Sequence, residues 1–331
     1  MEHFGFPIEV IAIFFGTIAV SIYLDLFAHR KAKSISITSA AKWCAFWIVI
    51  ALLFYVYLWI RFDKYWADMY LAGYLLEKSL SIDNLVVFIA IFSSFGINSH
   101  LQHRILYWGI LGALAFRAIF VVIGTGLFYA TPWVGFLFAA FVAWSGVQML
   151  RDKSTGEEIE DYTHHWSVNC IGKLMPVYTR LFGERFFMKH DEIKSESDSA
   201  PVTRKGLWYA TPAFLCLVAI EASDLAFAFD SVPAVISVTQ EPLLVYAAMI
   251  FAILGLRTLY FVIAALTDYL VHLKKAVVAL LFFIAAKMTL QSWNHVFGDT
   301  GIHIDPQVSV LIVIGTLAIG VLASFILPAK K

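Results

Sequence analysis

The chain has 331 residues, of which 60% are hydrophobic and 15% are charged, and its mean hydropathy is +0.78. Soluble domains are about half apolar and about one quarter charged, so this composition excludes an ordinary soluble protein and indicates one embedded in a lipid bilayer. The formal net charge is zero, so the total indicates neither an acidic nor a basic partner. We expect the lipid bilayer as a partner and no nucleic acid.

A membrane-spanning helix needs about 20 mostly apolar residues, and the chain contains nine such stretches. The first does not have the pattern of a signal peptide, because no basic segment precedes it and the basic cluster at 29–33 follows it instead. We therefore expect an all-α integral membrane protein in which residues 1–331 form a single membrane domain. The predicted spans cover about residues 8–27, 43–62, 67–93, 104–126, 131–150, 207–238, 243–267, 275–295 and 307–327.

The distribution of Lys and Arg predicts the orientation, because cytoplasmic loops are enriched in them. If the N-terminus is outside, the inner segments and their boundaries hold about 18 of the 24 Lys and Arg. The outer loop 296–306 holds none and carries two aspartates. We predict a multi-pass protein of the bacterial inner membrane with an outer N-terminus and a cytoplasmic C-terminus.

Residues 151–206 are the only long hydrophilic stretch and are predicted to be cytoplasmic. Within them, 172–187 mixes basic and apolar residues as an interfacial amphipathic helix does, and 190–198 has the composition of a flexible linker. The loop histidines His164, His165 and His190 are interpreted as solvated rather than as metal ligands.

The three cysteines, Cys44, Cys170 and Cys216, are widely separated and form no Cys-x-x-Cys or Cys/His zinc pattern. Cys44 and Cys216 fall in apolar stretches, where a small buried side chain is the expected role. We therefore expect neither a disulfide framework nor a dithiol redox centre, and no bound cofactor.

An internal repeat relates the third to fifth predicted spans to the sixth to eighth. Residues 110–123 read ILGALAFRAIFVVI and residues 250–263 read IFAILGLRTLYFVI, which places Arg117 on Arg257. Shared apolar composition is the competing explanation, but the matching arginines argue against it. Three helices per unit invert the second unit in the membrane, so we predict an inverted 3+3 repeat, at about 67–150 and 207–293, as in many secondary transporters.

The same repeat pairs two acidic motifs. Glu77, Asp83 and Asn84 fall on Asp224, Asp230 and Ser231, and Glu221 precedes the second set. A mid-membrane Asp costs roughly 2.5–3.5 kcal/mol on the least severe insertion scale, so such acids must be paired, protonated or metal-bound. The set of predicted metal ligands is Glu77, Asp83, Asn84, Glu221, Asp224, Asp230 and Ser231.

Helical spacing limits how these groups converge. Glu221 and Asp224 share a helix face, whereas Asp224 and Asp230 lie about 120° apart on a straight helix. One site uses both only if the helix is broken or a second helix approaches. Pro233 removes a backbone donor, and we expect the break there, close to Asp230.

Three cations also lie within predicted spans, and two interpretations stay open for them. Arg117, Arg257 and Lys287 either form structural ion pairs or balance the carboxylates when metal is absent. A purely structural ion-pair network is the alternative for the acids as well, although the acids outnumber the cations. Lys78 is expected to point elsewhere or to snorkel toward the interface, and Asp25 near the inner end of the first span is either solvated or on the way into the site.

Carboxylates with an amide or a hydroxyl form a hard, oxygen-rich site that suits Mn²⁺, Mg²⁺ or Ca²⁺. The motifs also resemble those of the TerC/Alx family of bacterial membrane proteins. The similarity lies in Gly73–Phe88 and in residues 210–234 and 251–261, and the chain length and span layout look most like the Alx branch. The resemblance implies the fold of the LysE transporter superfamily and, for Alx-like members, manganese export; it assigns the acidic motifs to the ion pathway.

We therefore predict an inner-membrane Mn²⁺ exporter, not an enzyme, that works by alternating access, with protons as the counter-ion. One alternative is another transported cation, such as Ca²⁺ or a small basic metabolite. A second is a non-transporting stress-response or redox partner protein that docks through 151–206. No nucleophile–base motif beside the acids supports a membrane hydrolase.

Overall fold

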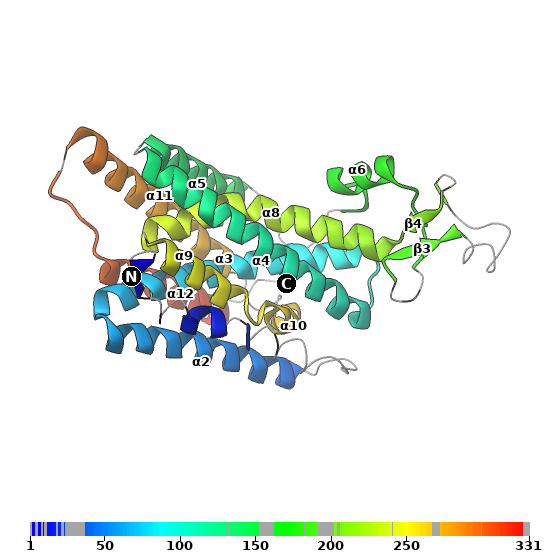
Figure 1. Cartoon of the computed structure of the whole chain (residues 1–331), viewed down its shortest axis with the longest axis horizontal. Helices are drawn as coiled ribbons and strands as arrows, with labels where there is room; N and C mark the ends of the chain where they lie inside the picture. The colour runs from blue at the N-terminus through cyan, green and yellow to red at the C-terminus, as the bar shows by residue number, and fades with distance from the viewer. Residues whose placement is uncertain are drawn as a thin grey trace. The chain divides into compact units, whose positions relative to one another are not determined.

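The protein is almost entirely helical in its computed structural model (Figure 1). Contacts divide the chain into two compact units. Three helices contribute residues to both, namely α3 (Lys64–Ser94), α4 (Ser99–Ala130) and α8 (Pro212–Thr239). Unit 1 comprises 1–83, 114–153 and 227–331, and unit 2 comprises 84–113 and 154–226. The residues that the structure describes are 2–3, 6–7, 9, 12–17, 19–20, 23, 37–131, 133–151, 162–181, 183, 185–190, 202–203, 206–239, 241–266, 272–298 and 300–326.

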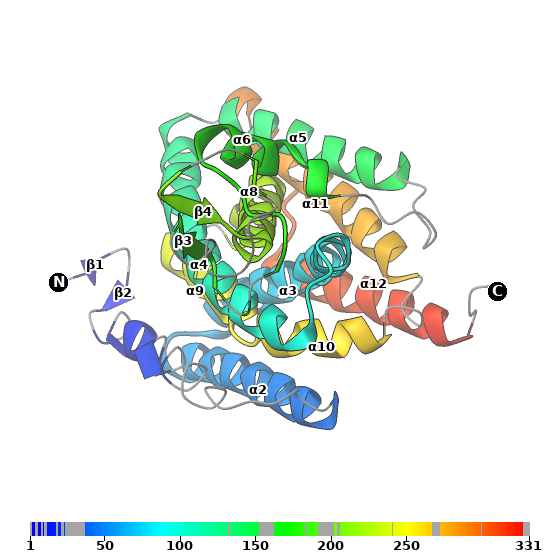
Figure 2. The same ribbon diagram turned by 90° about the vertical axis from the view of Figure 1, so that its right-hand side faces the viewer.

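The helices form where the apolar runs lie, since buried backbone in a bilayer must satisfy its own hydrogen bonds. In unit 1, α11 packs against α5 and α12, and α10 packs against α2 (Figure 2). Two short strands, Glu2–His3 (β1) and Phe6–Pro7 (β2), pair at the N-terminus. The long helices are α2 (Ile37–Arg61), α3 (Lys64–Ser94), α4 (Ser99–Ala130), α5 (Trp133–Arg151), α8 (Pro212–Thr239), α9 (Pro242–Ile253), α10 (Leu256–Leu266), α11 (Leu273–Phe297) and α12 (Pro306–Ile326).

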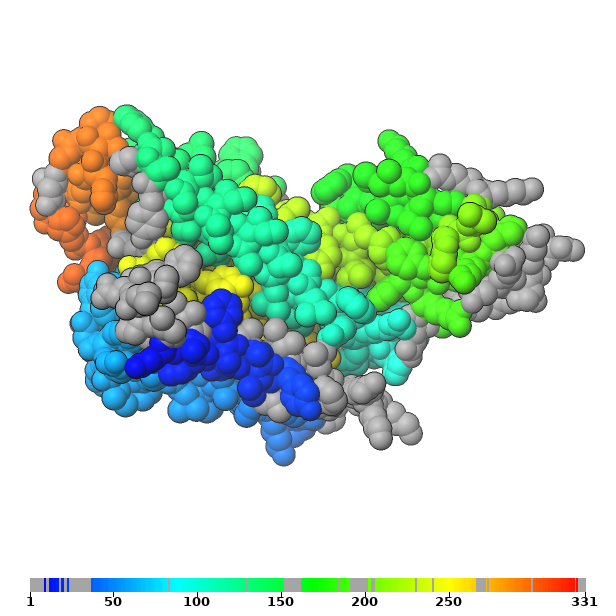
Figure 3. Space-filling model, viewed as in Figure 1, coloured from blue at the N-terminus to red at the C-terminus, as the bar shows by residue number. Residues whose placement is uncertain are grey.

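The core of unit 1 is rich in aromatic side chains. Phe14, from the described part of the first predicted span, is fully buried and lies with its ring 6.2 Å from that of Phe54 in α2 and 5.7 Å from that of Tyr246 in α9. Figure 3 shows the blue residues of this N-terminal segment lying over the light blue α2. Tyr70 and Phe251 join the same cluster, so α3 and α9 are held to α2 by aromatic packing.

Unit 2 contains the hydrophilic stretch. Its helix α6 (Trp166–Leu174) is followed by an antiparallel pair of strands, β3 (Phe187–Lys189) and β4 (Trp208–Ala210). The predicted interfacial helix at 172–187 is therefore wrong: the helix ends at Leu174, and the chain then pairs with β4 through Val177. Pro176 has no backbone N–H, which disfavours continuing the helix.

Six helices are long and apolar enough to cross a membrane, namely α2, α4, α5, α8, α11 and α12, and the bent pair α9–α10 makes a seventh if it is one span. This number covers the described part of the chain, from which much of the first predicted span is missing. Helix α3 is absent from the set because charged residues interrupt it, Glu77 and Lys78 among them. The predicted count of nine spans is thus not confirmed.

The predicted repeats coincide with two runs of helices, α3–α5 and α8–α11. Their inverted orientation stays a prediction. The expected helix break at Pro233 is wrong, because α8 runs continuously through this proline. The break lies instead at Leu254–Gly255, where α9 and α10 meet at a bend of 50°.

Candidate functional site

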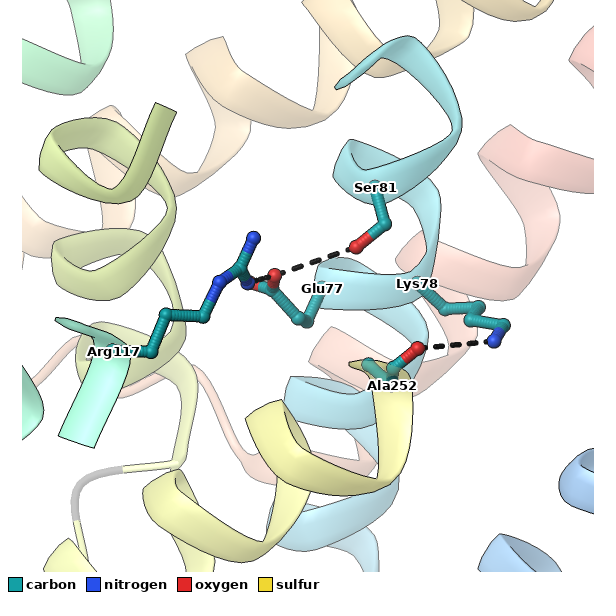
Figure 4. A network of polar contacts seen from close by, with 5 residues as sticks. All are labelled: Glu77, Lys78, Ser81, Arg117 and Ala252. Carbon is teal, nitrogen blue, oxygen red and sulfur yellow. Dashed lines mark hydrogen bonds and ion pairs between the residues drawn. The ribbon is translucent and has the colours of Figure 1, made fainter. Parts of the chain in front are cut away.

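A buried ion pair joins the two first helices of the predicted first repeat (Figure 4). Glu77 on α3 and Arg117 on α4 are 0% and 2% exposed, and the Arg117 guanidinium contacts Glu77 Oε1. The Ser81 hydroxyl, one turn along α3, donates to the same oxygen at 3.4 Å. This ion pair at Arg117 is compatible with both interpretations of the intramembrane cations, the structural one and the balancing of carboxylates when metal is absent.

Lys78, the next residue on α3, points away from this pair (Figure 4). Its ammonium nitrogen donates a hydrogen bond of 3.0 Å to the backbone carbonyl of Ala252, in the last turn of α9. The expectation that Lys78 points elsewhere than the acids is consistent with this contact. Its carbonyl partner was not predicted.

Glu221 occupies a different environment, in the part of α8 that belongs to unit 2. Its carboxylate lies against Gly112 of α4 so closely that a Cβ on residue 112 would overlap it. The Oε2 atom is buried and has no hydrogen-bond partner among the described residues. A buried carboxylate oxygen without a donor is unfavourable, so this group is suited to binding a proton or a cation.

Asp224 lies three residues further along α8 and is 4% exposed. The spacing places it on the same helix face as Glu221, as the sequence predicted. Asn84 of α3, also in unit 2, is buried, and its Nδ2 has no hydrogen-bond partner within the described chain. Ser231 in unit 1 is also buried, and its Oγ has no hydrogen-bond partner among the described residues.

The remaining predicted cations are buried in unit 1. Lys287 of α11 donates to the hydroxyl of Ser309 on α12 at 2.9 Å, which links these two helices. Arg257 lies in the first turn of α10, 4% exposed. Within the described part of the chain, Lys287 is thus held by a neutral oxygen rather than by an acid.

The convergence of the acids into one metal site stays a prediction. Among the side chains that the structure describes, no three His, Cys, Asp or Glu residues are grouped as metal ligands would be. The side chains of Asp83 and Asp230, and the whole of Asp25, lie outside the described residues.

Sequence reasoning missed three features of these helices. Lys78 was not recognised as the partner of α9, Gly112 was not recognised as the contact of Glu221, and Asp68 of α3 was not considered. Asp68 is 4% exposed and accepts a hydrogen bond of 3.2 Å from the Tyr55 hydroxyl. Only Asp68 had a signal in the sequence, as a further acid within a predicted span.

The profile of the Integral membrane protein TerC family matches residues 62–331. This chain belongs to the TerC family. It is 47% identical to the Tellurium resistance protein TerC of Serratia marcescens, over 99% of this chain and 96% of that protein. No solved structure matches it significantly.

A second group of relatives carries the provisional name membrane-bound redox modulator Alx. The protein of this name from Photorhabdus laumondii is 34% identical over 85% of each chain, and that from Escherichia coli (strain K12) is 32% identical over 84% of this chain and 85% of the relative. The resemblance to the TerC/Alx family is confirmed. Identity is higher to the TerC-named protein than to these Alx proteins, which does not support placing the chain nearest the Alx branch.

Proposed function

We propose that this TerC-family membrane protein exports a divalent metal ion, Mn²⁺, across the bacterial inner membrane in exchange for protons. The observation that carries the proposal is the Glu221 carboxylate, which is set in an apolar helix against the bare backbone of Gly112 with one oxygen lacking a donor. Such a group gains most from a bound cation or proton.

Asp224 adds a second carboxylate one turn away, and the amide of Asn84 belongs to the same unit. These are hard oxygen donors, which suit Mn²⁺, Mg²⁺ or Ca²⁺. The same carboxylates hold protons when no metal is bound, which provides the exchange. Glu77 is a weaker candidate ligand because Arg117 already neutralises it. Asp83, Asp230 and Ser231 complete the proposed ion pathway on the strength of their motifs alone.

The direct test is Mn²⁺ flux into proteoliposomes with an entrapped metal-sensitive dye. Glu221→Gln keeps the shape of the side chain and removes its charge, so we expect at least a tenfold loss of flux, since about 1.4 kcal/mol of lost binding already gives that factor. The matched control is Asp68→Asn, which neutralises another buried acid, one that already accepts a hydrogen bond from Tyr55. Equal flux in Glu221→Gln and the unmodified protein would refute the assignment.

A cellular test addresses the two acids whose side chains lie outside the described residues. Asp83→Asn and Asp230→Asn should abolish protection against excess manganese while membrane insertion is retained. Unchanged intracellular manganese in both variants contradicts a role for these residues in export.

The competing cargoes enter the same flux assay. Ca²⁺ competition separates a calcium transporter from a manganese one, and tellurite tests the property that the TerC-named relatives carry in their name. We expect no tellurite flux, because an oxyanion is repelled by the carboxylates. A dithiol redox role is disfavoured because Cys44, Cys170 and Cys216 are widely separated in the sequence and form no Cys-x-x-Cys motif, and two of them are buried.

The proposed orientation places the N-terminus outside and the C-terminus in the cytoplasm. Lys and Arg distribution supports it. Cysteine labelling at position 170, which is exposed in unit 2, should succeed only from the cytoplasmic side. Labelling from the outside would reverse the assignment.

A further inference from the structure

The break between α9 and α10 is built by specific residues rather than being a local irregularity. Gly255 has φ of +78°, a left-handed conformation that favours glycine. A Cβ at this position would also overlap the side chain of Trp47 in α2. Trp47 is itself 2% exposed and belongs to the core of unit 1. Both the backbone conformation and the neighbouring ring therefore require glycine here.

A helix that ends inside a membrane protein leaves its last carbonyl oxygens without intrahelical donors, and it carries a partial negative charge at that end. Leu254 still donates to Ile250 at 2.9 Å, which closes the last turn of α9. Beyond it, the chain turns by 50°. The carbonyl end of α9 is thus an acceptor-rich, negatively polarised place within the core of unit 1.

Lys78 supplies the positive charge at this place. Its ammonium donates to the Ala252 carbonyl at 3.0 Å, and Ala252 is fully buried. Figure 4 shows the Lys78 side chain projecting from α3 on the side opposite Glu77, with its ammonium bonded to that carbonyl. Among the residues whose side chains the structure describes, no carboxylate forms an ion pair with Lys78. The ammonium is therefore compensated by the helix end and not by an acid.

In transporters with discontinuous helices, the carbonyl ends of half-helices coordinate small monovalent cations. We propose that the Lys78 ammonium is a tethered cation that occupies a monovalent-cation site at the carbonyl end of α9. The protein then needs no dissolved monovalent cation to stabilise the break. This inference rests on the geometry at the break and does not depend on which ion the protein transports.

The predicted first repeat offers an internal comparison. There the position of Gly255 is taken by Ala115, and α4 continues through it without a break. The position of Lys78 in the second acidic motif is taken by Leu225. Where the helix is continuous, its carbonyls have intrahelical donors and no cation is required. The lysine and the break occur together.

The test measures thermal unfolding of the purified full-length protein in detergent, followed by tryptophan fluorescence. Lys78→Ala removes the cation and leaves room for a replacement, whereas Lys78→Met removes it and fills the space. Lys78→Arg keeps a cation. Each is measured in choline chloride, and then with choline replaced by methylammonium or Na⁺ at constant ionic strength. The control is Lys287→Ala, which removes another buried lysine, one that donates to a hydroxyl.

We expect Lys78→Ala to lower the Tm by several degrees in choline and methylammonium or Na⁺ to restore it saturably. Lys78→Met should lose the same stability without recovery, and Lys78→Arg should lose less. The unmodified protein and Lys287→Ala should be insensitive to the cation exchange. If Lys78→Ala is too unstable to purify in choline, recovery is measured as the yield of monodisperse protein prepared with methylammonium.

Three results would overturn the proposal. They are an unchanged Tm for Lys78→Ala in choline, no recovery with either small cation, and equal recovery in Lys287→Ala. The measurement needs no transport activity, so absent Mn²⁺ flux would count against the proposed function and leave this inference standing.

Discussion

The second helices of the two predicted repeats, α4 and α9–α10, have similar sequences but different structures. Helix α4 runs unbroken for 32 residues, whereas its counterpart divides into helices of 12 and 11 residues (Figure 1). Arg117 and Arg257 fall at equivalent positions in the two sequences, and both are buried. The alanine at 115 and the glycine at 255 mark where the structures diverge.

The difference shows that a glycine permits a break without causing one. Helix α4 contains glycines at 109, 112, 124 and 126 and stays continuous. At 255 the glycine is accompanied by Trp47, which packs against it, and by Lys78, which satisfies a carbonyl of the preceding turn. In the continuous helix α4, Arg117 forms an ion pair with Glu77 of α3. At the break, Lys78 of α3 instead donates a hydrogen bond to the end of α9.

The largest expected effect is at the ion pair of the continuous helix. Arg117→Met leaves Glu77 buried without its partner and should destabilise the protein by about 3–5 kcal/mol. The double variant Glu77→Gln/Arg117→Met should recover much of that loss, because neither charge of this pair remains. Chemical denaturation of the four proteins in detergent gives the coupling energy. Equal stability of the single and double variants would contradict a compensated pair.

Exchanging the two residues that distinguish the helices tests the break itself. Gly255→Ala should cost about 2–4 kcal/mol, the sum of left-handed strain and overpacking against Trp47. Ala115→Gly should cost only about 0.5–1 kcal/mol, the entropy of a glycine in a helix. Thermal unfolding of both variants measures the two losses of stability. If the two losses are the same, Gly255 has no special role at the break.

A smaller effect is expected within α4, where two glycines have opposite surroundings. Gly112→Ala should displace the Glu221 carboxylate and cost about 1–2 kcal/mol. At Gly126 no atom lies within 4 Å of the place that a Cβ would take, so Gly126→Ala should stabilise by about 0.5–1 kcal/mol. Opposite signs in the two Tm shifts support the contact, and a stabilised Gly112→Ala argues against it.

The smallest effect is at Glu241, which precedes α9 outside the spans. Burial raises the pKa of this half-buried carboxyl above its ordinary value of 4.5. The contribution of Glu241 to folding stability is fully present below the unfolded-state pKa, and it is lost as pH rises through the folded-state pKa. Above about pH 4.5, Glu241→Gln should therefore become slightly more stable than the unmodified protein, by less than about 0.5 kcal/mol in the free energy of unfolding. Parallel Tm–pH curves would show that Glu241 does not titrate differently on folding.

Much of the helical framework could be predicted from the sequence, because a bilayer requires long apolar runs to be helices. Burial of Glu77, Asp224 and the three intramembrane cations followed from the same pattern. The position of the break did not. Pro233 has a strong local signal, yet its loss of one hydrogen bond is tolerated within α8. Gly255 has a weak one, and its conformation depends on Trp47 from a distant part of the chain.

The candidate site was predictable as a set of residue types but not as a set of contacts. Arg117 and Arg257 had equivalent sequence positions, and nothing local indicated that Arg117 would be paired with Glu77. Likewise, Glu221 and Gly112 are joined only by how α8 and α4 pack. These contacts are products of tertiary packing, which one-dimensional spacing does not encode.

The contact between Gly255 and Trp47 shows that the region shared by the family and the region needed for the core differ in extent. The family profile begins at residue 62, after α2 has ended. Yet α2 contributes Trp47, Ala51, Phe54 and Leu58 to the core of unit 1. A fragment trimmed to 62–331 would keep every acidic motif and lose the wall against which the helix bend is formed. The region that matches the family, residues 62–331, is therefore shorter than the region that we expect to be required for folding.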